Sequence, residues 1–146
     1  MMVVSEKYRG ETPYYIFFSS DGGIISVTDR AARFYSRSGE KRGEELFSRT
    51  ITDARFEAGK LVIAGGEVGF SGTNVTVISE DGRNKDTFST DEKICSICAD
   101  EDRVYLLGYG KLYIKGGDES ELEIESGAIN MFSVGKNDIV LCYTYG

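Results

Sequence analysis

Two cysteines in this sequence have a spacing that is used in chemistry. Cys95 and Cys98 form a C-x-x-C pair, which occurs in redox centres and as half of a zinc site. A redox pair usually lies at a helix N-terminus, whereas this pair lies within a strand-like pattern. A zinc site needs two more ligands, and the chain has no His and only Cys142 besides. We therefore interpret both cysteines as small strand residues and expect no cofactor and no metal.

Carboxylates are the other candidates for catalysis. Paired acids can hydrolyse glycosides, and the candidates are Glu67, Asp81, Asp100 and Asp102. All but Glu67 fall at expected hairpin turns, where Asp commonly bonds the local backbone. The absence of His excludes Ser–His and Cys–His catalytic pairs. The sequence thus favours a protein that is not an enzyme. A carbohydrate-binding or glycoside-hydrolase-type domain that uses turn carboxylates is the alternative.

The segment from Gly65 to Asn74 is the candidate recognition element. It is a long, Gly-rich connection between two expected strands, and binding residues tend to lie on such loops when a rigid scaffold holds them. We expect it to contact a protein or peptide partner, with Phe70 as the apolar contact. The candidate partner-binding residues are Gly65, Gly66, Glu67, Val68, Phe70 and Asn74.

Charge and hydropathy exclude other partners. The net charge is −7 and the pI is about 4.7, whereas a nucleic-acid-binding surface is normally basic. No apolar run reaches the length of a membrane span, so neither nucleic acid nor a membrane is expected. The N-terminus has no apolar core of signal-peptide length. We expect a cytoplasmic protein if Met1 is the native start, and an extracytoplasmic one if an upstream signal or anchor was removed.

The elements that hold these residues recur along the chain. An anchor residue at Tyr14, Ile51, Ile94 or Ile129 is followed by an apolar residue at +3 and by an apolar stretch from +10. An apolar residue also stands at +5, except in the first repeat, where Ser19 occupies that position. The anchors are 37, 43 and 35 residues apart. Each repeat therefore begins with a hairpin of two strands, called a and b.

A second hairpin, of strands c and d, follows in the first three repeats. Turn residues such as Ser38-Gly39, Asp81-Gly82 and Gly116-Gly117 separate its strands. The apolar triplets Leu61–Ile63 and Ile139–Leu141 indicate b strands that are buried on both faces. The more polar d strands indicate an outer edge. The sequence predicts fourteen strands and no helix.

Four-stranded units of about this length are typical of β-propeller blades. The chain resembles a β-propeller of the quinoprotein-like or WD40-like type, although it lacks their Trp and His signatures. One unit, from Leu61 to Gly66, resembles a kelch repeat because a Gly doublet follows an apolar strand. The resemblance implies an all-β array of about three and a half blades that serves as a non-catalytic binding module. A β-trefoil is the alternative fold.

We expect a leader or edge strand over 1–13 and a single repeat domain over 14–146, with repeats at 14–50, 51–93 and 94–128 and a partial repeat at 129–146. Propellers close with about four to eight blades, so three and a half need completion. Two copies would make seven, or the remainder of a longer chain would close the ring. A further alternative is therefore a half-propeller that acts only after assembly.

Overall fold

The computed structural model describes residues 10–66, 69, 71–135 and 138–143. Its regular elements are all strands, and none of the described residues belongs to a helix that could cross a membrane. The strands are β1 (Pro13–Phe18), β2 (Ile24–Thr28), β3 (Ala31–Tyr35), β4 (Lys41–Leu46), β5 (Thr50–Glu57), β6 (Lys60–Gly66), β7 (Thr73–Ser79), β8 (Lys85–Thr90), β9 (Ser96–Ala99), β10 (Val104–Leu107), β11 (Lys111–Lys115), β12 (Ser120–Glu123), β13 (Ala128–Gly135) and β14 (Asp138–Tyr143).

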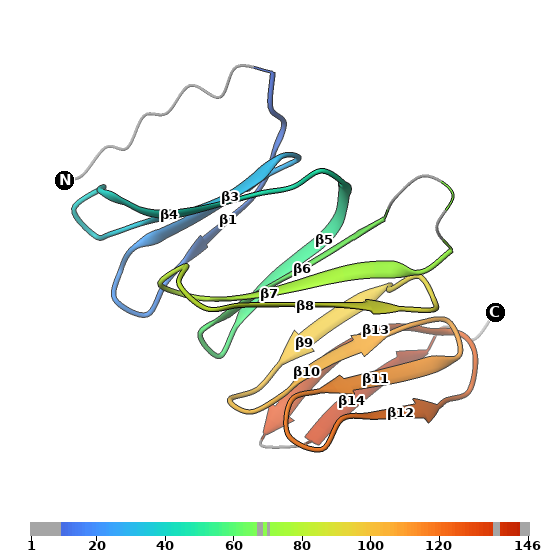
Figure 1. Cartoon of the computed structure of the whole chain (residues 1–146). Coiled ribbons are helices and arrows are strands. Elements are labelled where there is room, and N and C mark those ends of the chain that lie inside the picture. Colours follow the sequence, from blue (N-terminus) through green and yellow to red (C-terminus); the bar gives the residue numbers. More distant parts are fainter. Residues whose placement is uncertain (1–9, 67–68, 70, 136–137, 144–146) are drawn as a thin grey trace.

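The strands form four antiparallel sheets that follow one another in chain order (Figure 1). Three sheets have four strands each, in the orders β1-β2-β3-β4, β5-β6-β7-β8 and β9-β10-β11-β12, and the fourth is the hairpin β13-β14. We call them blades 1 to 4. The expected all-β class and the array of about three and a half blades are confirmed. The domain limits remain a prediction, and residues 1–9 of the expected leader lie outside the described residues.

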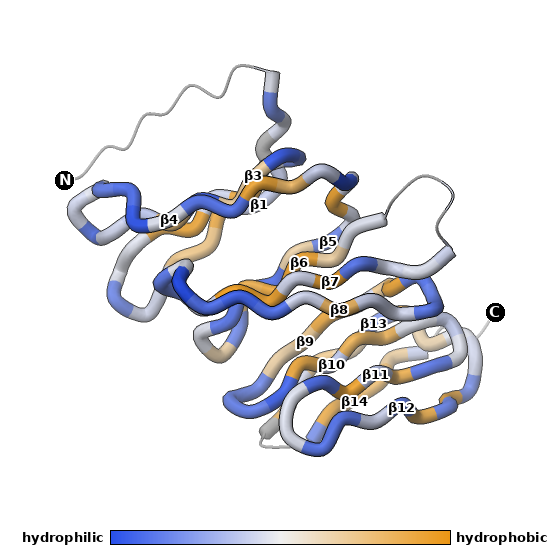
Figure 2. Tube along the Cα trace, in the orientation of Figure 1, coloured by the Kyte–Doolittle hydropathy of each residue, from blue (hydrophilic) through white to orange (hydrophobic). Residues whose placement is uncertain are grey.

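The b strands of the inner blades each contribute side chains to two cores. In blade 2, Leu61 and Ile63 pack against blade 1, whereas Val62 between them packs against blade 3, and all three are fully buried. Blade 3 repeats the pattern, because Leu106 faces blade 2 and Tyr105 faces blade 4. In Figure 2 hydrophobic residues gather along strands such as β6 and β10, and hydrophilic residues gather at hairpin turns. The period-2 alternation of a strand thus gives each inner blade two apolar faces.

The a strands depart from the expected repeat. In blade 2 the +3 residue, Ala54, pairs with Ile63 and faces the preceding blade. In blades 1 and 4 the equivalent residues, Phe17 and Phe132, pair instead with Ile25 and Val140. A one-residue change in register turns every side chain of a strand to the other face. Phe17 therefore faces blade 2, whereas Phe132 lies on the outer face of blade 4 and is 43% exposed.

The expectation that Ile139–Leu141 is buried on both faces is wrong. Ile139 and Leu141 pack against the core shared with blade 3, but Val140 is 38% exposed. Val140 occupies the alternating position that faces the next blade in the inner sheets, and it lies on the outer face of the last sheet. The d strands β4, β8 and β12 are mostly exposed and lie at the sheet edges, as expected from their polarity.

An ion-pair cluster lies on the face of blade 1 that points away from blade 2. The Arg33 guanidinium donates to both oxygens of Glu11, each at 2.8 Å, and to Glu44 at 2.7 Å. The bonds from Arg33 and from the Thr28 hydroxyl lower the pKa of Glu11 to about 2. The bonds to Glu11 and Glu44 raise the pKa of Arg33. The cluster joins the segment before β1 to strand β3.

Shortening Leu61 should destabilise the fold strongly. Leu61→Ala removes a fully buried side chain between blades 1 and 2, and such a cavity costs about 2–5 kcal/mol in free energy of unfolding. Urea denaturation measures the change. The matched variant Leu122→Ala, at a half-exposed position of β12, should cost under about 1 kcal/mol. Equal losses at both positions would contradict the assignment of Leu61 to a shared core.

The Glu11–Arg33 pair should make stability depend on acid. The pKa of Glu11 falls from 4.5 to about 2 on folding, so its contribution is complete above pH 4.5 and disappears as the pH falls toward 2. Glu11→Gln should cost about 1–2 kcal/mol at pH 7, and its difference from wild type should shrink over that acid range. Glu119→Gln, which removes an exposed pair with Lys115, should cost under about 0.5 kcal/mol. Denaturation midpoints measured against pH test both.

Candidate functional site

The expected recognition loop is described only at its ends. Gly65 and Gly66 close strand β6, and Asn74 lies in β7, where it pairs with Gly65. A Cβ at Gly65 would stand 2.7 Å from the carbonyl oxygen of Thr50, so the close approach of β5 requires glycine there. Glu67, Val68 and Phe70 lie outside the described residues. The partner-binding role of all six residues stays a prediction.

Asn74 lines a shallow groove of about 310 Å³ on blade 2. Its side-chain oxygen accepts a hydrogen bond from the Ser89 hydroxyl at 2.7 Å. Arg49 reaches the same groove from the connection between blades 1 and 2 and donates to the Thr76 hydroxyl at 2.5 Å. The lining residues are Arg49, Asn74, Val75, Thr87, Phe88 and Ser89. Only Asn74 among them could be identified from the sequence, because the others come from strands expected to be structural and, for Arg49, from the connection between β4 and β5.

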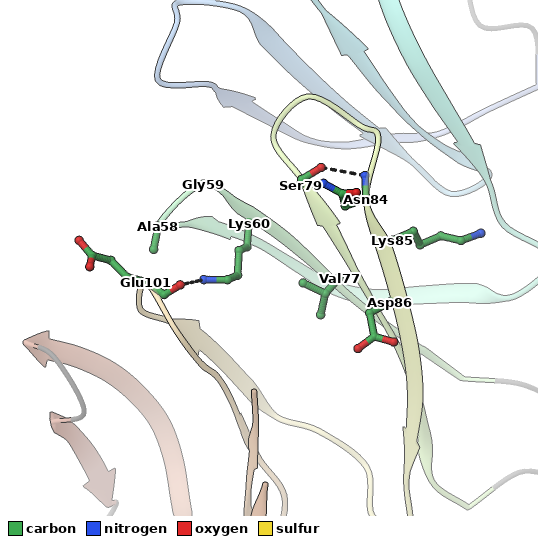
Figure 3. A pocket seen from close by; sticks show the side chains of 9 residues that line it. All are labelled: Ala58, Gly59, Lys60, Val77, Ser79, Asn84, Lys85, Asp86 and Glu101. Atoms are coloured by element: carbon green, nitrogen blue, oxygen red, sulfur yellow. Dashed lines mark hydrogen bonds between the residues drawn. The ribbon is translucent and has the colours of Figure 1, made fainter. Parts of the chain in front are cut away.

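A larger groove, of about 420 Å³, lies at the other end of blade 2, where blade 3 adjoins it (Figure 3). We call it the interblade groove. Its lining comes from the β5–β6 turn, from strands β7 and β8 beside their turn, and from the β9–β10 turn. The lining residues are Ala58, Gly59, Lys60, Val77, Ser79, Asn84, Lys85, Asp86 and Glu101.

Two tight turns shape the walls of the interblade groove. Ala58 and Gly59 both have positive φ, at 48° and 70°, as the two-residue hairpin turn between β5 and β6 requires. In the β7–β8 turn, the Ser79 hydroxyl donates to Asp81 at 2.5 Å and accepts from the amide of Asn84 at 3.0 Å. Local bonding therefore holds this lining in place.

Lys60 joins blades 2 and 3 across the groove. Its ammonium group donates to the backbone carbonyl of Asp100 at 2.6 Å and to that of Glu101 at 2.5 Å, and Figure 3 draws the bond to Glu101. A second bond between the same blades runs from the amide of Ala99 to the Glu57 carboxylate at 2.9 Å. Blade 2 therefore holds the β9–β10 hairpin of blade 3 from two sides.

The groove has an apolar floor and an acidic mouth. Val77 and Ala58 supply the apolar surface, and Asp86 and Glu101 are exposed acids beside it. The charge of Lys60 is directed at carbonyl oxygens, and Lys85 turns to Glu45 of blade 1 at 2.8 Å. In Figure 3 the Lys85 side chain extends away from Asp86. The groove therefore suits a ligand that combines an aliphatic group with a positive charge.

No motif marks this groove in the sequence. Its residues were visible only as turn signals, such as Ala58-Gly59 and Asp81-Gly82, and as a β7 strand residue, Val77. Glu101 joins them because blade 3 packs on blade 2. The alternation of Val77 with the buried Ile78 is the one signal that points to a partly covered apolar position.

Only one of the two cysteines is a buried strand residue as expected, because Cys95 is exposed and precedes β9. Ile94, Ile97 and Ala99 are buried between blades 2 and 3, as their inward pattern predicted. Cys98 is fully buried and packs toward blade 4. Burial raises the pKa of its thiol to about 12, so little nucleophilic thiolate exists at neutral pH. The two thiols are not joined in a disulfide.

Two of the candidate turn carboxylates, Asp81 and Asp100, bond their own hairpins. Asp81 accepts from the Ser79 hydroxyl and from the amide of Arg83, and these bonds lower its pKa. Asp100 is buried and accepts from the amides of Asp102 and Arg103 and from the Tyr105 hydroxyl. A general acid at neutral pH needs a raised pKa, and Asp81 has the opposite shift. Glu67, the fourth carboxylate considered, lies outside the described residues.

No protein-family model matches this sequence, and no curated protein does. Solved structures are similar, among them the N-terminal domain of Nup159, with a TM-score of 0.58 at 10% identity over 89% of this chain and 38% of that one. A protein of unknown function from Bacteroides caccae gives 0.55 at 11% identity, over 92% of this chain and 54% of that one. Kluyvelomyces marxianus Hsv2 gives 0.52 at 8% identity, over 82% and 42%.

The Nup159 domain and Hsv2 are β-propellers. This chain has a partial β-propeller fold. The four-stranded antiparallel sheets agree with that assignment, so the β-trefoil alternative is not the fold observed. The chain spans about two fifths to one half of the length of these similar structures. Identities near 10% show the fold alone, and the finer quinoprotein-like or WD40-like type stays a prediction.

Removing the Lys60 contact should loosen the β9–β10 turn. Lys60→Ala leaves the carbonyls of Asp100 and Glu101 without a charged donor, which should cost about 1–2 kcal/mol in free energy of unfolding. It should also speed amide hydrogen exchange at residues 100–103. The matched variant Lys85→Ala removes a surface ion pair and should cost under about 1 kcal/mol. Unchanged exchange in Lys60→Ala would contradict the inter-blade role of Lys60.

Proposed function

We propose that this chain is a non-catalytic, propeller-type interaction module that binds a segment of a protein partner in the interblade groove. The observation that carries the proposal is the groove itself, which combines an apolar floor at Val77 and Ala58 with the exposed carboxylates of Asp86 and Glu101. Rigid strands and bonded turns form its walls, so its shape exists before a ligand arrives. Such preformed, partly apolar grooves with a few polar groups are typical binding sites.

The charges that line the interblade groove favour a partner segment that is positively charged. Both lysines of the groove are engaged, Lys60 by carbonyl oxygens and Lys85 by Glu45. The carboxylates at the mouth add to a net charge of −7, which attracts cationic segments and speeds their association. A peptide that places an aliphatic side chain on Val77 and a Lys or Arg beside Asp86 fits this arrangement.

The comparisons are consistent with a binding role. One similar structure is a complex in which S. cerevisiae Dbp5 is bound to Nup159 together with Gle1, IP6 and ADP, with a TM-score of 0.58 at 11% identity over 90% of this chain and 39% of the matched one. The turn carboxylates Asp81 and Asp100 are bonded within their own hairpins. This second observation favours a binding module over a glycoside hydrolase.

Charge reversal at the groove should weaken peptide binding. Peptides selected from a random phage-displayed library on the immobilised chain should be enriched in Lys or Arg next to an aliphatic residue. Asp86→Lys should lower their affinity about tenfold, equivalent to about 1.4 kcal/mol, measured by fluorescence anisotropy. Asp118→Lys makes the same charge change on an exposed turn of blade 3 and should change affinity less than about twofold.

The same assay separates the groove from the predicted loop. A variant with alanine at Glu67, Val68 and Phe70 changes the segment between β6 and β7 that the sequence predicts to bind a partner. If this variant loses binding while Asp86→Lys retains it, the loop is the binding face and the groove is not. Equal losses in Asp86→Lys and Asp118→Lys would show attraction by overall charge and would contradict a specific groove.

A further inference from the structure

The first and last sheets each carry exposed apolar residues on their outer faces. On blade 1 these residues lie on β1 and β2, beside Arg33 of β3, which shares that face and is buried in its ion pairs with Glu11 and Glu44. On blade 1, Ile16 and Phe18 are 67% and 72% exposed, and Phe18 pairs with the half-buried Ile24. We call this the leading face. On blade 4, Phe132 and Val140 pair with each other and are 43% and 38% exposed. We call this the trailing face. Large apolar patches of this kind mark interaction surfaces.

The two faces are the two halves of one inter-blade contact. The trailing residues Phe132 and Val140 occupy the same pairing as Phe17 and Ile25 of blade 1, which pack against blade 2. The leading residues Ile16 and Ile24 correspond in register to Met131 and Ile139 of blade 4, which pack against blade 3. Each face thus presents half of a core whose complete form exists elsewhere in the chain.

Side-chain hydrogen bonds also join consecutive blades, at different repeat positions in the two contacts that follow. Tyr15 of blade 1 reaches forward to Asp53 of blade 2 through its hydroxyl at 3.1 Å. Asn130 of blade 4 receives a bond from the Ser96 hydroxyl of blade 3 at 2.8 Å. Consecutive blades are therefore joined near their a strands by side-chain hydrogen bonds as well as by apolar packing. A leading face that meets a trailing face brings the corresponding strands together.

Charge adds complementarity at the outer rim. Residues 37–42, in the β3–β4 hairpin of blade 1, contain three basic residues and one acid. Arg37, Lys41 and Arg42 are exposed, and of these Lys41 pairs with Glu44 and Arg42 with Asp21 of the same blade. Residues 116–125, around β12 of blade 3, contain five acids and no basic residue. Among the described residues, blade 4 has no c or d strand beside β12. A blade 1 seated on the trailing face therefore brings its basic hairpin toward this acidic rim.

We propose that a second copy of this chain occupies both faces, with the leading face of each copy packed on the trailing face of the other. The contact is heterologous, and a two-fold axis makes its two occurrences identical, so the pair forms a closed ring. The pair holds six four-stranded and two two-stranded sheets, a number with which propellers close. This proposal concerns surfaces distinct from the interblade groove and does not depend on peptide binding.

The mass of the protein in solution tests the ring. Light scattering coupled to size exclusion should give about 32 kDa, twice the 16.1 kDa of one chain. Phe18→Asp, on the leading face, and Phe132→Asp, on the trailing face, should each give the single-chain mass, because either change places a charge in both contacts of the ring. Tyr109→Asp, at a 75% exposed position on the β10–β11 turn, should keep the double mass.

Mixing the two face variants makes the test specific. An equimolar mixture of Phe18→Asp and Phe132→Asp has one intact contact between an unaltered leading face and an unaltered trailing face. It should therefore recover a species of double mass that neither variant forms alone. This recovery also shows that both variants are folded, because an unfolded chain offers no face.

Four results would overturn the proposal. A wild-type chain of single mass at micromolar concentrations excludes the pair. Loss of the pair in Phe18→Asp but not in Phe132→Asp shows that two leading faces meet. Species larger than a pair show a contact that does not close. Absence of recovery in the mixture, with both variants giving native circular dichroism spectra, shows that the two faces do not bind each other.

Discussion

Each inner sheet of this chain has two apolar faces, and such a sheet cannot bury them without a neighbour on each side. The rest of the structure depends on this constraint. The b strands meet it by alternation, since Leu61 and Ile63 contribute to one core and Val62 to the next. Hydrogen bonds between blades, such as that from Ala99 to Glu57, align sheets that apolar contact alone would allow to slide. Stability thus resides between the sheets.

The b strands were predictable because burial on both faces requires uninterrupted apolar residues, and Leu61–Ile63 stands out in the sequence. The d strands were predictable because an exposed edge strand carries polar residues. The register of the a strands was not, because the positions of Phe17 and Phe132 depend on how each hairpin aligns its two strands. Nothing in the apolar pattern distinguishes them from Ala54 and Ile97, which face the other way.

In the candidate site, too, some residues could be predicted from the sequence and others could not. Gly65 could be singled out because the Gly doublet is a local signal, and its contact with Thr50 explains it. The interblade groove was missed because Val77 and Glu101 come from different blades and meet only after the sheets pack. The role of Lys60 could not be predicted from the sequence either, because its acceptors are backbone carbonyls that any residue would provide. A site assembled between repeats leaves no motif within one repeat.

The shared b strand has a consequence for how substitutions combine. Val62 and Ile63 are neighbours in the chain, yet they belong to different cores. Ile63 and Phe34 are far apart in the chain and belong to the same one. Energetic coupling follows shared contacts more closely than sequence distance. Substitutions at residues one repeat apart that share a core should therefore be more strongly coupled than substitutions at adjacent residues. Compensating changes in this protein would accumulate in the two facing surfaces of one core.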